Sequence, residues 1–361
     1  MTAKILIVAF AGLAVLAIGF GARAVWRRNR SPATTRAGIT SLGDDAPPFH
    51  VNDAVRVESV NAIVAERLWR LAFAAPKVAE RLEPEHARVR DAVTAELQAG
   101  KFDPTYFPRR PTLMPQLMRT VNDPDAGAEA ISDIIAQDPV LTGDVLRLAN
   151  SSFYRVSREP VETIQRAVVI CGMGGLQKLL AVALLQPVFR ATDKNFPRFP
   201  PLLWVRTERA ALAAELYAAE IRRQDRFEAQ MLALLSALGP LVVYRATVAA
   251  YAHAPGLPPS ADLCVTLIGS LGQQTAQSIA RQWESSPRLV EALRISGPDP
   301  EQAPDQALAL ALFSGELIGT LSLLESQRDI SPSLRQRLTE KAGLPEESTA
   351  SIWDRLTTPR D

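Results

Sequence analysis

The sequence predicts an all-α protein, and two patterns carry the prediction. Apolar residues recur three and four positions apart, which is the period of a helix with one buried face. Alternating β-branched runs bounded by Asn-Gly or Asp-Gly, which would indicate β-hairpins, are absent. The runs of helical length in the larger, C-terminal part of the chain cover residues 112–121, 127–137, 140–149, 163–171, 175–190, 201–223, 226–252, 260–283 and 304–325.

The composition is that of a globular protein. Of the 361 residues, 47% are apolar, and 40 Lys and Arg against 39 Asp and Glu leave a net charge of +1. These values exclude a disordered tail protein and any attraction of the whole chain to nucleic acid, so we expect no nucleic-acid partner. Three His and two Cys are too few for a disulfide framework or for a zinc module built from Cys pairs.

An uncharged apolar run lies near the start of the chain, at residues 5–22. About 20 such residues cross the hydrocarbon core of a bilayer. Only Lys4 precedes the run, whereas several arginines follow it, and this asymmetry places the C-terminal part in the cytoplasm. We therefore expect residues 1–30 to form a transmembrane helix whose basic flank touches anionic lipid headgroups. The flanking residues are Arg23, Arg27, Arg28 and Arg30.

Two other interpretations of this run stay open. Ala22-Arg23-Ala24 has the small-x-small form of a signal-peptide cleavage site, and a cleaved chain beginning near Val25 would be exported. The run could also be a buried helix of a soluble domain, which would need partners on every face.

The chain between the apolar run and residue 115 divides into three parts. Residues 31–50 mix Pro, Gly, Ser, Thr and charge without an apolar period, which predicts a linker. Residues 51–100 show helical periodicity broken at Pro76 and Pro84, which predicts a small region of two or three helices. Four prolines in residues 101–115 exclude a continuous helix, and we place a domain boundary there.

The segment 131–157 contains a helix start with a physical mechanism. The side chain of Asp138 can accept hydrogen bonds from free backbone amides, and Pro139 has no amide proton to leave unpaired at the first helical position. An apolar stripe follows, and Asn150-Ser151-Ser152 then ends the helix. The residues alone thus predict a capped helix followed by a turn.

Three segments in order resemble the HDOD domain, the "HD-related output domain" of bacterial signalling proteins. They are FPRRPTLMPQLMRTVNDPDAG, IIAQDPVLTGDVLRLANSSFY and TIQRAVVICGMGGLQKLLAVALL. The resemblance is best supported over residues 103–283. It reaches the C-terminus through QALALALFSGELIG and SPSLRQRLTEKAGLP, which resemble the last helices of the family, so we expect an HDOD-like helical domain over residues 103–361.

The resemblance implies a fold similar to that of HD-type metal phosphohydrolases, whose metal site needs an adjacent His-Asp pair. No His of this chain is followed by Asp. Ser236 and Ala237 stand at the degenerate positions of the pair, and a neutral hydroxyl and a methyl group cannot replace its metal ligands. We therefore expect no enzymatic activity, no metal site and no cofactor.

Other candidate chemistry is weaker. Asp133, Asp138 and Asp144 cluster in sequence and could form a carboxylate magnesium site, although Asp138 is better used as a cap. The glycines of residues 171–175 predict a tight turn between two helices, since neither a preceding strand nor a Gly-Lys-Ser/Thr segment supports a phosphate loop. Lys178 is expected on a solvated helix face.

We therefore expect a non-enzymatic signalling or scaffolding protein that docks unidentified protein partners at the cytoplasmic face of the inner membrane, crossing it once. A diverged HD-type phosphohydrolase or nucleotide-binding enzyme is the alternative, and an exported helical binding protein is the second. Aromatic residues and arginine are enriched at interface anchors, so the turn after the capped helix is the candidate contact, although its residues could instead be structural. It comprises Asn150, Ser151, Phe153, Tyr154 and Arg155.

A double substitution tests this interface prediction. Asn150→Asp together with Arg155→Glu is expected to impair partner capture without unfolding the chain. A collapse of thermal stability would instead identify structural residues.

Overall fold

The computed structural model describes twelve stretches of the chain, all within the compact unit His50–Asp361. The predicted transmembrane helix with its four flanking arginines, and the linker 31–50, lie outside the described residues, as do Phe153, Tyr154 and Arg155. The described stretches are 57–74, 84–100, 102, 106, 120, 128–136, 138–151, 159–189, 194–222, 226–294, 306–344 and 346–357.

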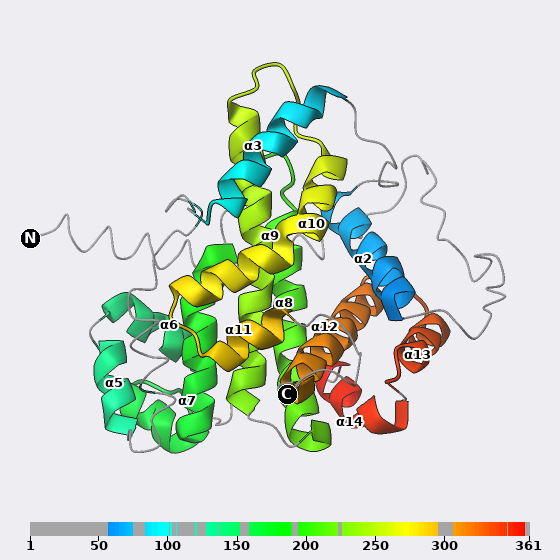
Figure 1. Ribbon diagram of the computed structural model, residues 1–361. Coiled ribbons are helices and arrows are strands. Elements are labelled where there is room, and N and C mark those ends of the chain that lie inside the picture. Colours follow the sequence, from blue (N-terminus) through cyan, green and yellow to red (C-terminus); the bar gives the residue numbers. More distant parts are fainter. Residues whose placement is uncertain are drawn as a thin grey trace, which may run out of the picture. The chain divides into compact units, whose positions relative to one another are not determined.

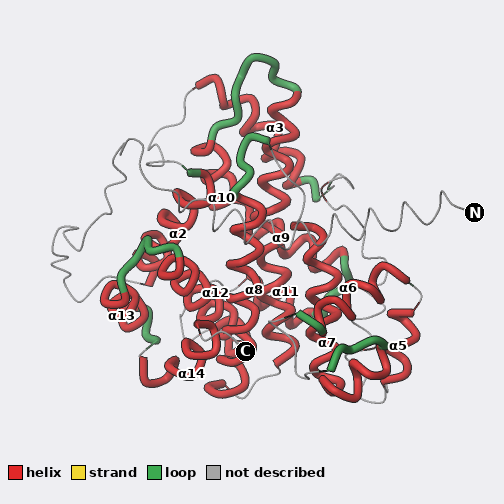
Figure 2. The backbone as a smooth tube through the Cα atoms, turned by 180° about the vertical axis from the view of Figure 1, so that it is seen from behind, coloured by secondary structure: helices red, strands yellow, loops and turns green. Residues whose placement is uncertain are grey.

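Every regular element in these stretches is a helix, which confirms the all-α fold class (Figure 2). Short 3-10 and π elements occur at η1 Pro84–His86 and η3 Ala218–Arg222. The α-helices are α2 Val57–Phe73, α3 Ala87–Gln98, α5 Ala128–Ala136, α6 Pro139–Ala149, α7 Ile164–Phe189, α8 Phe199–Tyr217, α9 Arg226–Ala252, α10 Ala261–Gln282, α11 Pro287–Arg294, α12 Gln306–Ser326, α13 Pro332–Lys341 and α14 Glu346–Thr357.

The helix α9 runs through the middle of the domain and packs against both α8 and α10, while α12 packs along α8 and also contacts α9 (Figure 1). By length and composition α9 and the segment Ala307–Ser326 of α12 could cross a membrane, and the two bent halves of α7 would add a third span if taken as one. The apolar windows of α9 and α12 are 78% and 83% buried inside the protein. A helix that is apolar all round and covered by neighbours is a core helix of a large domain, which is the role these two have here.

Small residues allow the central helices to approach closely. A Cβ atom on Gly239 of α9 would collide with the backbone carbonyl of Gly272 on α10. At the contact of α12 with α8, Gly315 and Gly319 lie against Ala214 and Ala210. The four-residue spacing puts both glycines on one face of α12, so the backbones of the two helices can touch over a full turn.

Residues 51–100 do not form a separate bundle in the described structure. The helix α2 packs on α8, α12 and α13, and α3 packs on α9 and α10. The buried side chains of Val64 and Val93 accordingly belong to the same hydrophobic core as those of the later helices. The boundary predicted near residue 103 is therefore not a boundary between two compact units, because helices from both sides of it share one hydrophobic core.

Local sequence signals place two further features. Gly172 has a left-handed backbone conformation with φ of 70°, and α7 is kinked there, which confirms a turn within residues 171–175. The helix α11 was not among the predicted runs because it has only eight residues. Its start carries a readable signal, since Ser286 accepts a hydrogen bond from the amide of Leu289 and Pro287 occupies the first position.

Candidate functional site

The predicted cap of α6 is present. Oδ1 of Asp138 accepts a hydrogen bond of 3.2 Å from the amide of Leu141, and Pro139 is the first residue of the helix. The carbonyl of Asp138 accepts the amide of Thr142 at 2.9 Å, as a residue that begins a helix should. This most specific part of the family resemblance therefore has a structural role in starting α6.

Asn150, at the end of α6, is engaged by the chain's own backbone. Its Nδ2 donates to the carbonyls of Leu146 at 2.9 Å and Val161 at 2.8 Å, and its Oδ1 accepts from the amide of Val161 at 2.7 Å. The hydroxyl of Ser151 donates to the carbonyl of Leu148 at 2.7 Å. The side chain of Asn150 thus ties the end of α6 to the start of the segment before α7, which is a positioning role within the fold.

Ser236 and Ala237, which the family resemblance places at the positions of the HD pair, lie on α9. The side chain of Ala237 is fully buried, with 0% exposed. The hydroxyl of Ser236 donates a hydrogen bond of 2.8 Å to Oε1 of Glu316 on α12. The carboxylate of Glu316, which is a group that can ligate a metal ion, therefore lies beside Ser236. The two residues are 80 positions apart in sequence.

An arginine accompanies that carboxylate. Nη2 of Arg206 on α8 lies 3.2 Å from the same Oε1 atom of Glu316, and Nε of Arg206 donates to Oγ1 of Thr320 at 3.2 Å. The side chain of Arg206 is only 12% exposed, against 28% for Glu316. The guanidinium charge offsets the carboxylate charge, so a divalent cation would be repelled by a permanent cation next to its one carboxylate ligand.

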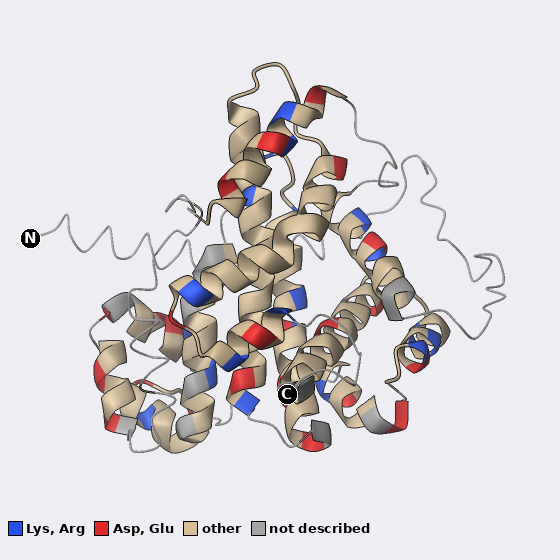
Figure 3. Ribbon diagram, viewed as in Figure 1, with Lys and Arg blue, Asp and Glu red and all other residues tan. Residues whose placement is uncertain are grey.

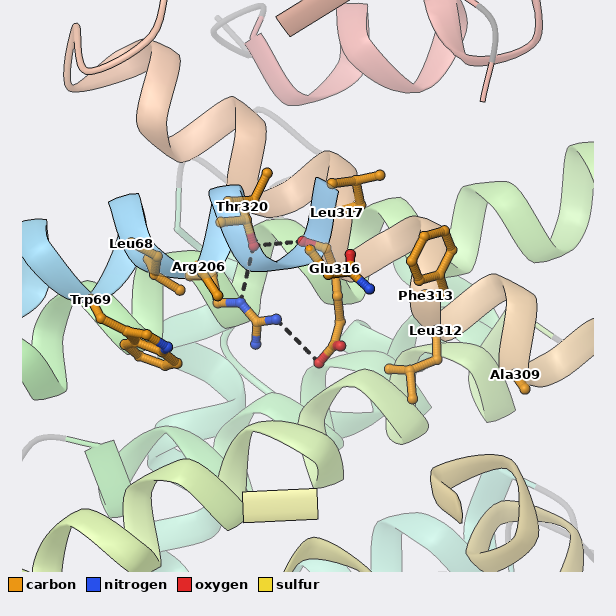
Figure 4. A pocket seen from close by; sticks show the side chains of 12 residues that line it. Leu68, Trp69, Arg206, Ala309, Leu312, Phe313, Glu316, Leu317 and Thr320 are labelled. Carbon is orange, nitrogen blue, oxygen red and sulfur yellow. Dashed lines mark hydrogen bonds and ion pairs between the residues drawn. The ribbon is translucent and has the colours of Figure 1, made fainter. Parts of the chain in front are cut away.

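A cavity of about 260 Å³ opens onto this polar cluster (Figure 4). Leu68 and Trp69 of α2 lie on one side of it, and Leu312 and Phe313 of α12 lie on the other. The guanidinium of Arg206 lies between these two apolar walls. A concave, mostly apolar space with a few convergent polar groups is the usual form of a small-molecule site.

The aspartates considered as magnesium ligands do not converge. Asp138 caps α6, Asp144 pairs with Arg147 at 2.6 Å, and Asp133 is exposed on α5. Within the described stretches no three His, Cys, Asp or Glu side chains are grouped so that they could hold a metal ion.

Lys178 is not on a solvated face, contrary to the expectation from its sequence neighbours. It pairs with Glu215 of α8, whose side chain is only 6% exposed. The periodicity of α7 does not reveal this partner because the pair joins two helices.

Burial raises the pKa of the half-buried Cys171 thiol, which works against its use as a nucleophile.

Sequence reasoning missed Arg206 and Glu316. One signal could have found Glu316, because it is the only charged residue in the apolar run ALALALFSGELIGTLSLL. A lone carboxylate on a helix that is buried all round needs a partner of opposite charge or a hydrogen-bond donor. The identity of that partner depends on which helices touch, which the sequence pattern does not give.

Charge elsewhere on the described helices is mixed. Lys or Arg and Asp or Glu both occur on each of α2, α3, α11 and α13 (Figure 3). This distribution agrees with the net charge of +1.

Comparison with known proteins gives a consistent family and fold. The family model described as "HDOD domain" matches residues 107–297, which is more than half of the chain. A curated Treponema pallidum (strain Nichols) protein named "Uncharacterized protein" is 31% identical over 87 residues. That match covers 24% of this chain and only 17% of the length of the relative.

Three solved structures have a similar fold. A "Putative phosphohydrolase" from Shewanella amazonensis SB2B is 22% identical, with 73% of this chain and 93% of that chain covered and a TM-score of 0.51. An HDOD domain protein with unknown function from Geobacter sulfurreducens is 20% identical, with coverages of 76% and 91% and a TM-score of 0.51. A "Putative metal-dependent phosphohydrolase" from Shewanella amazonensis SB2B is 16% identical, with coverages of 77% and 100% and a TM-score of 0.53. At these identities the likeness concerns the fold.

Proposed function

The chain belongs to the HDOD domain family, and we propose that it is a non-enzymatic signalling module that docks partner proteins at the cytoplasmic face of the inner membrane. The apolar run 5–22 and the arginines after it support the anchor and its orientation. In this proposal the domain supplies surfaces for docking rather than groups for catalysis.

The cluster of Ser236, Glu316 and Arg206 carries the non-enzymatic part of the proposal. A hydrolytic metal site needs several ligands with lone pairs and an open position for water. Here a hydroxyl and a guanidinium both engage Oε1 of Glu316. The guanidinium has no lone pair to offer, and its fixed charge opposes the charge of a metal ion.

A diverged phosphohydrolase or nucleotide-binding enzyme is the alternative. The names of two structural neighbours favour it, but at 22% and 16% identity those names describe the neighbours. An exported binding protein is the second alternative, and the N-terminal residue of the mature chain distinguishes it. A start near Val25 would contradict the anchored form.

Metal and nucleotide analysis of the purified full chain in detergent tests the proposal. We expect no divalent metal or nucleotide at a stoichiometric level, and no hydrolysis of bis-p-nitrophenyl phosphate with added Mn²⁺ or Mg²⁺. About one tightly held ion per chain would contradict the proposal.

A matched pair of variants then locates any activity. Glu316→Gln removes the carboxylate beside Ser236, whereas Glu291→Gln removes one on the surface of α11. Loss of retained metal in the first variant alone would identify the cluster as a metal site. Equal behaviour of both variants, with an empty protein, supports the docking proposal.

A further inference from the structure

The cavity between α2 and α12 contains an unengaged hydrogen-bond donor and an unengaged acceptor. Arg206 donates from Nε to Thr320 and lies nearest to Glu316 with Nη2, and among the described residues its Nη1 makes no hydrogen bond. Oε1 of Glu316 accepts a hydrogen bond from Ser236 and is the oxygen nearest to Arg206, and Oε2 accepts no hydrogen bond from a described residue. This donor and this acceptor belong to one ion pair, and both of its residues line the cavity.

The charges of Arg206 and Glu316 together determine which ligand charge the cavity favours. The guanidinium and the carboxylate, 3.2 Å apart, largely cancel at a distance. An anion would be attracted by Arg206 but repelled by the carboxylate of Glu316. A cation would be attracted by Glu316 but repelled by Arg206. A neutral group that both accepts and donates can satisfy both residues without adding charge to a partly buried site.

The apolar side chains that line the cavity favour an apolar, ring-shaped ligand. Trp69 and Phe313 are aromatic, and Leu68 and Leu312 complete two apolar sides (Figure 4). An apolar cavity of about 150 Å³ is large enough to bind benzene, so one aromatic ring with a polar edge fits this cavity of about 260 Å³.

We propose that this cavity binds a neutral planar ligand whose edge carries a hydrogen-bond acceptor next to a donor, as in a carboxamide, on an apolar ring. The acceptor of the ligand accepts a hydrogen bond from Nη1 of Arg206, and the donor of the ligand donates one to Oε2 of Glu316. This site goes beyond the proposed docking function and makes the protein a receptor for a small molecule. It does not rest on partner docking, so each proposal can fail without the other.

Three probes of one shape test the selectivity. Benzamide presents an acceptor and a donor, benzoate presents acceptors and a negative charge, and benzamidine presents donors and a positive charge. The full chain contains five Trp, and 5-fluorotryptophan labelling gives each one a ¹⁹F resonance. Comparison with Trp69→Phe assigns the resonance of Trp69. We expect benzamide to shift this resonance in a saturable way, at concentrations about fivefold lower than either charged probe.

Two variants reverse the charge preference. Glu316→Gln leaves the guanidinium alone, and benzoate should then bind about fivefold better than it does to the unchanged protein. Arg206→Gln leaves the carboxylate alone, and benzamidine should gain by a similar factor. Arg288→Gln, which removes an arginine paired with Glu228 on α9, is the control and should leave the order of the three probes unchanged.

Each outcome of these binding experiments either supports or overturns the proposed site. Shifts confined to Trp69, with benzamide preferred and the order reversed by the two variants, support the site. A shift of another Trp, no shift at all, or equal binding of the three probes overturns it. If the variants do not fold, the order of the three probes on the unchanged protein decides. A failed benzamide test with a metal-free protein leaves the docking proposal standing.

Discussion

Ser236 on α9 and Glu316 on α12 are joined by a hydrogen bond of 2.8 Å in which the hydroxyl donates to the carboxylate. The family resemblance places Ser236 at a position of the HD pair, and that placement stays a prediction, whereas the hydrogen bond of its hydroxyl to the carboxylate of Glu316 is a feature of the structure. Because Arg206 engages the same oxygen, the cluster is a charge-compensated link between three core helices.

Ser236→Ala should weaken this link without breaking the ion pair. We expect a loss of about 1 kcal/mol in the free energy of unfolding, the usual value of one partly buried hydrogen bond. The matched control is Ser270→Ala on α10, an exposed serine whose hydroxyl donates to the carbonyl of Leu267, where the change should stay within about 0.5 kcal/mol. Thermal unfolding measures both, and equal shifts would show that the Ser236 hydroxyl contributes nothing specific.

Asn150→Asp should destabilise the end of α6. The aspartate lacks the two N–H donors that now reach the carbonyls of Leu146 and Val161. It would place carboxylate oxygens near those carbonyls, and we expect a loss of about 2 kcal/mol. Hydrogen exchange should rise at the amides of α6 and of residues 159–163, while α12 amides keep their protection.

This expectation changes the design of the docking test in the turn after α6. Asn150→Asp is a structural substitution, so only Arg155→Glu, a position outside the described residues, tests partner capture without that complication. Unchanged stability of the Asn150→Asp chain would contradict the positioning role of Asn150 and return it to the set of contact residues.

Local signals in the sequence predicted the starts, ends and bends of helices, and they could not predict which helices touch. The cap at Asp138 and the turn near Gly172 depend on neighbouring residues, and both are present. The link between Ser236 and Glu316, the partner of Lys178 and the packing of α2 on the domain depend on tertiary contacts between distant segments. Periodicity records that a face is buried, but it does not record the neighbour that buries it.

Tyr251 should make stability fall at high pH. It shares a hydrogen bond of 2.6 Å with Nδ1 of the buried His86, and burial raises the pKa of Tyr251 to about 12. A tyrosine in an unfolded chain titrates near about 10. Its protonated form is thus favoured by the fold, and this stabilisation is complete below about pH 10 and is lost as the pH rises through about 12.

Urea unfolding at several pH values between about 9 and 12 tests the role of Tyr251. Tyr251→Phe should be less stable than the unchanged protein at pH 9, because it leaves Nδ1 of His86 without its present partner. The difference between the two proteins should shrink as the pH rises toward 12. A constant difference across this range would show that Tyr251 does not carry the pH dependence.

Gly239→Ala should be among the most destabilising single methyl additions in the chain. The new Cβ would collide with the backbone carbonyl of Gly272, and a backbone atom cannot rotate away as a side chain can. The helices α9 and α10 would have to separate, so we expect a loss of about 3 kcal/mol or more. Gly269→Ala, on an exposed face of α10 with nothing within 4 Å of the added Cβ, is the matched control. There the better helix propensity of Ala should stabilise by up to about 1 kcal/mol. Opposite shifts of the two melting temperatures would establish that the α9–α10 contact depends on the absence of a side chain at residue 239, and similar shifts would contradict it.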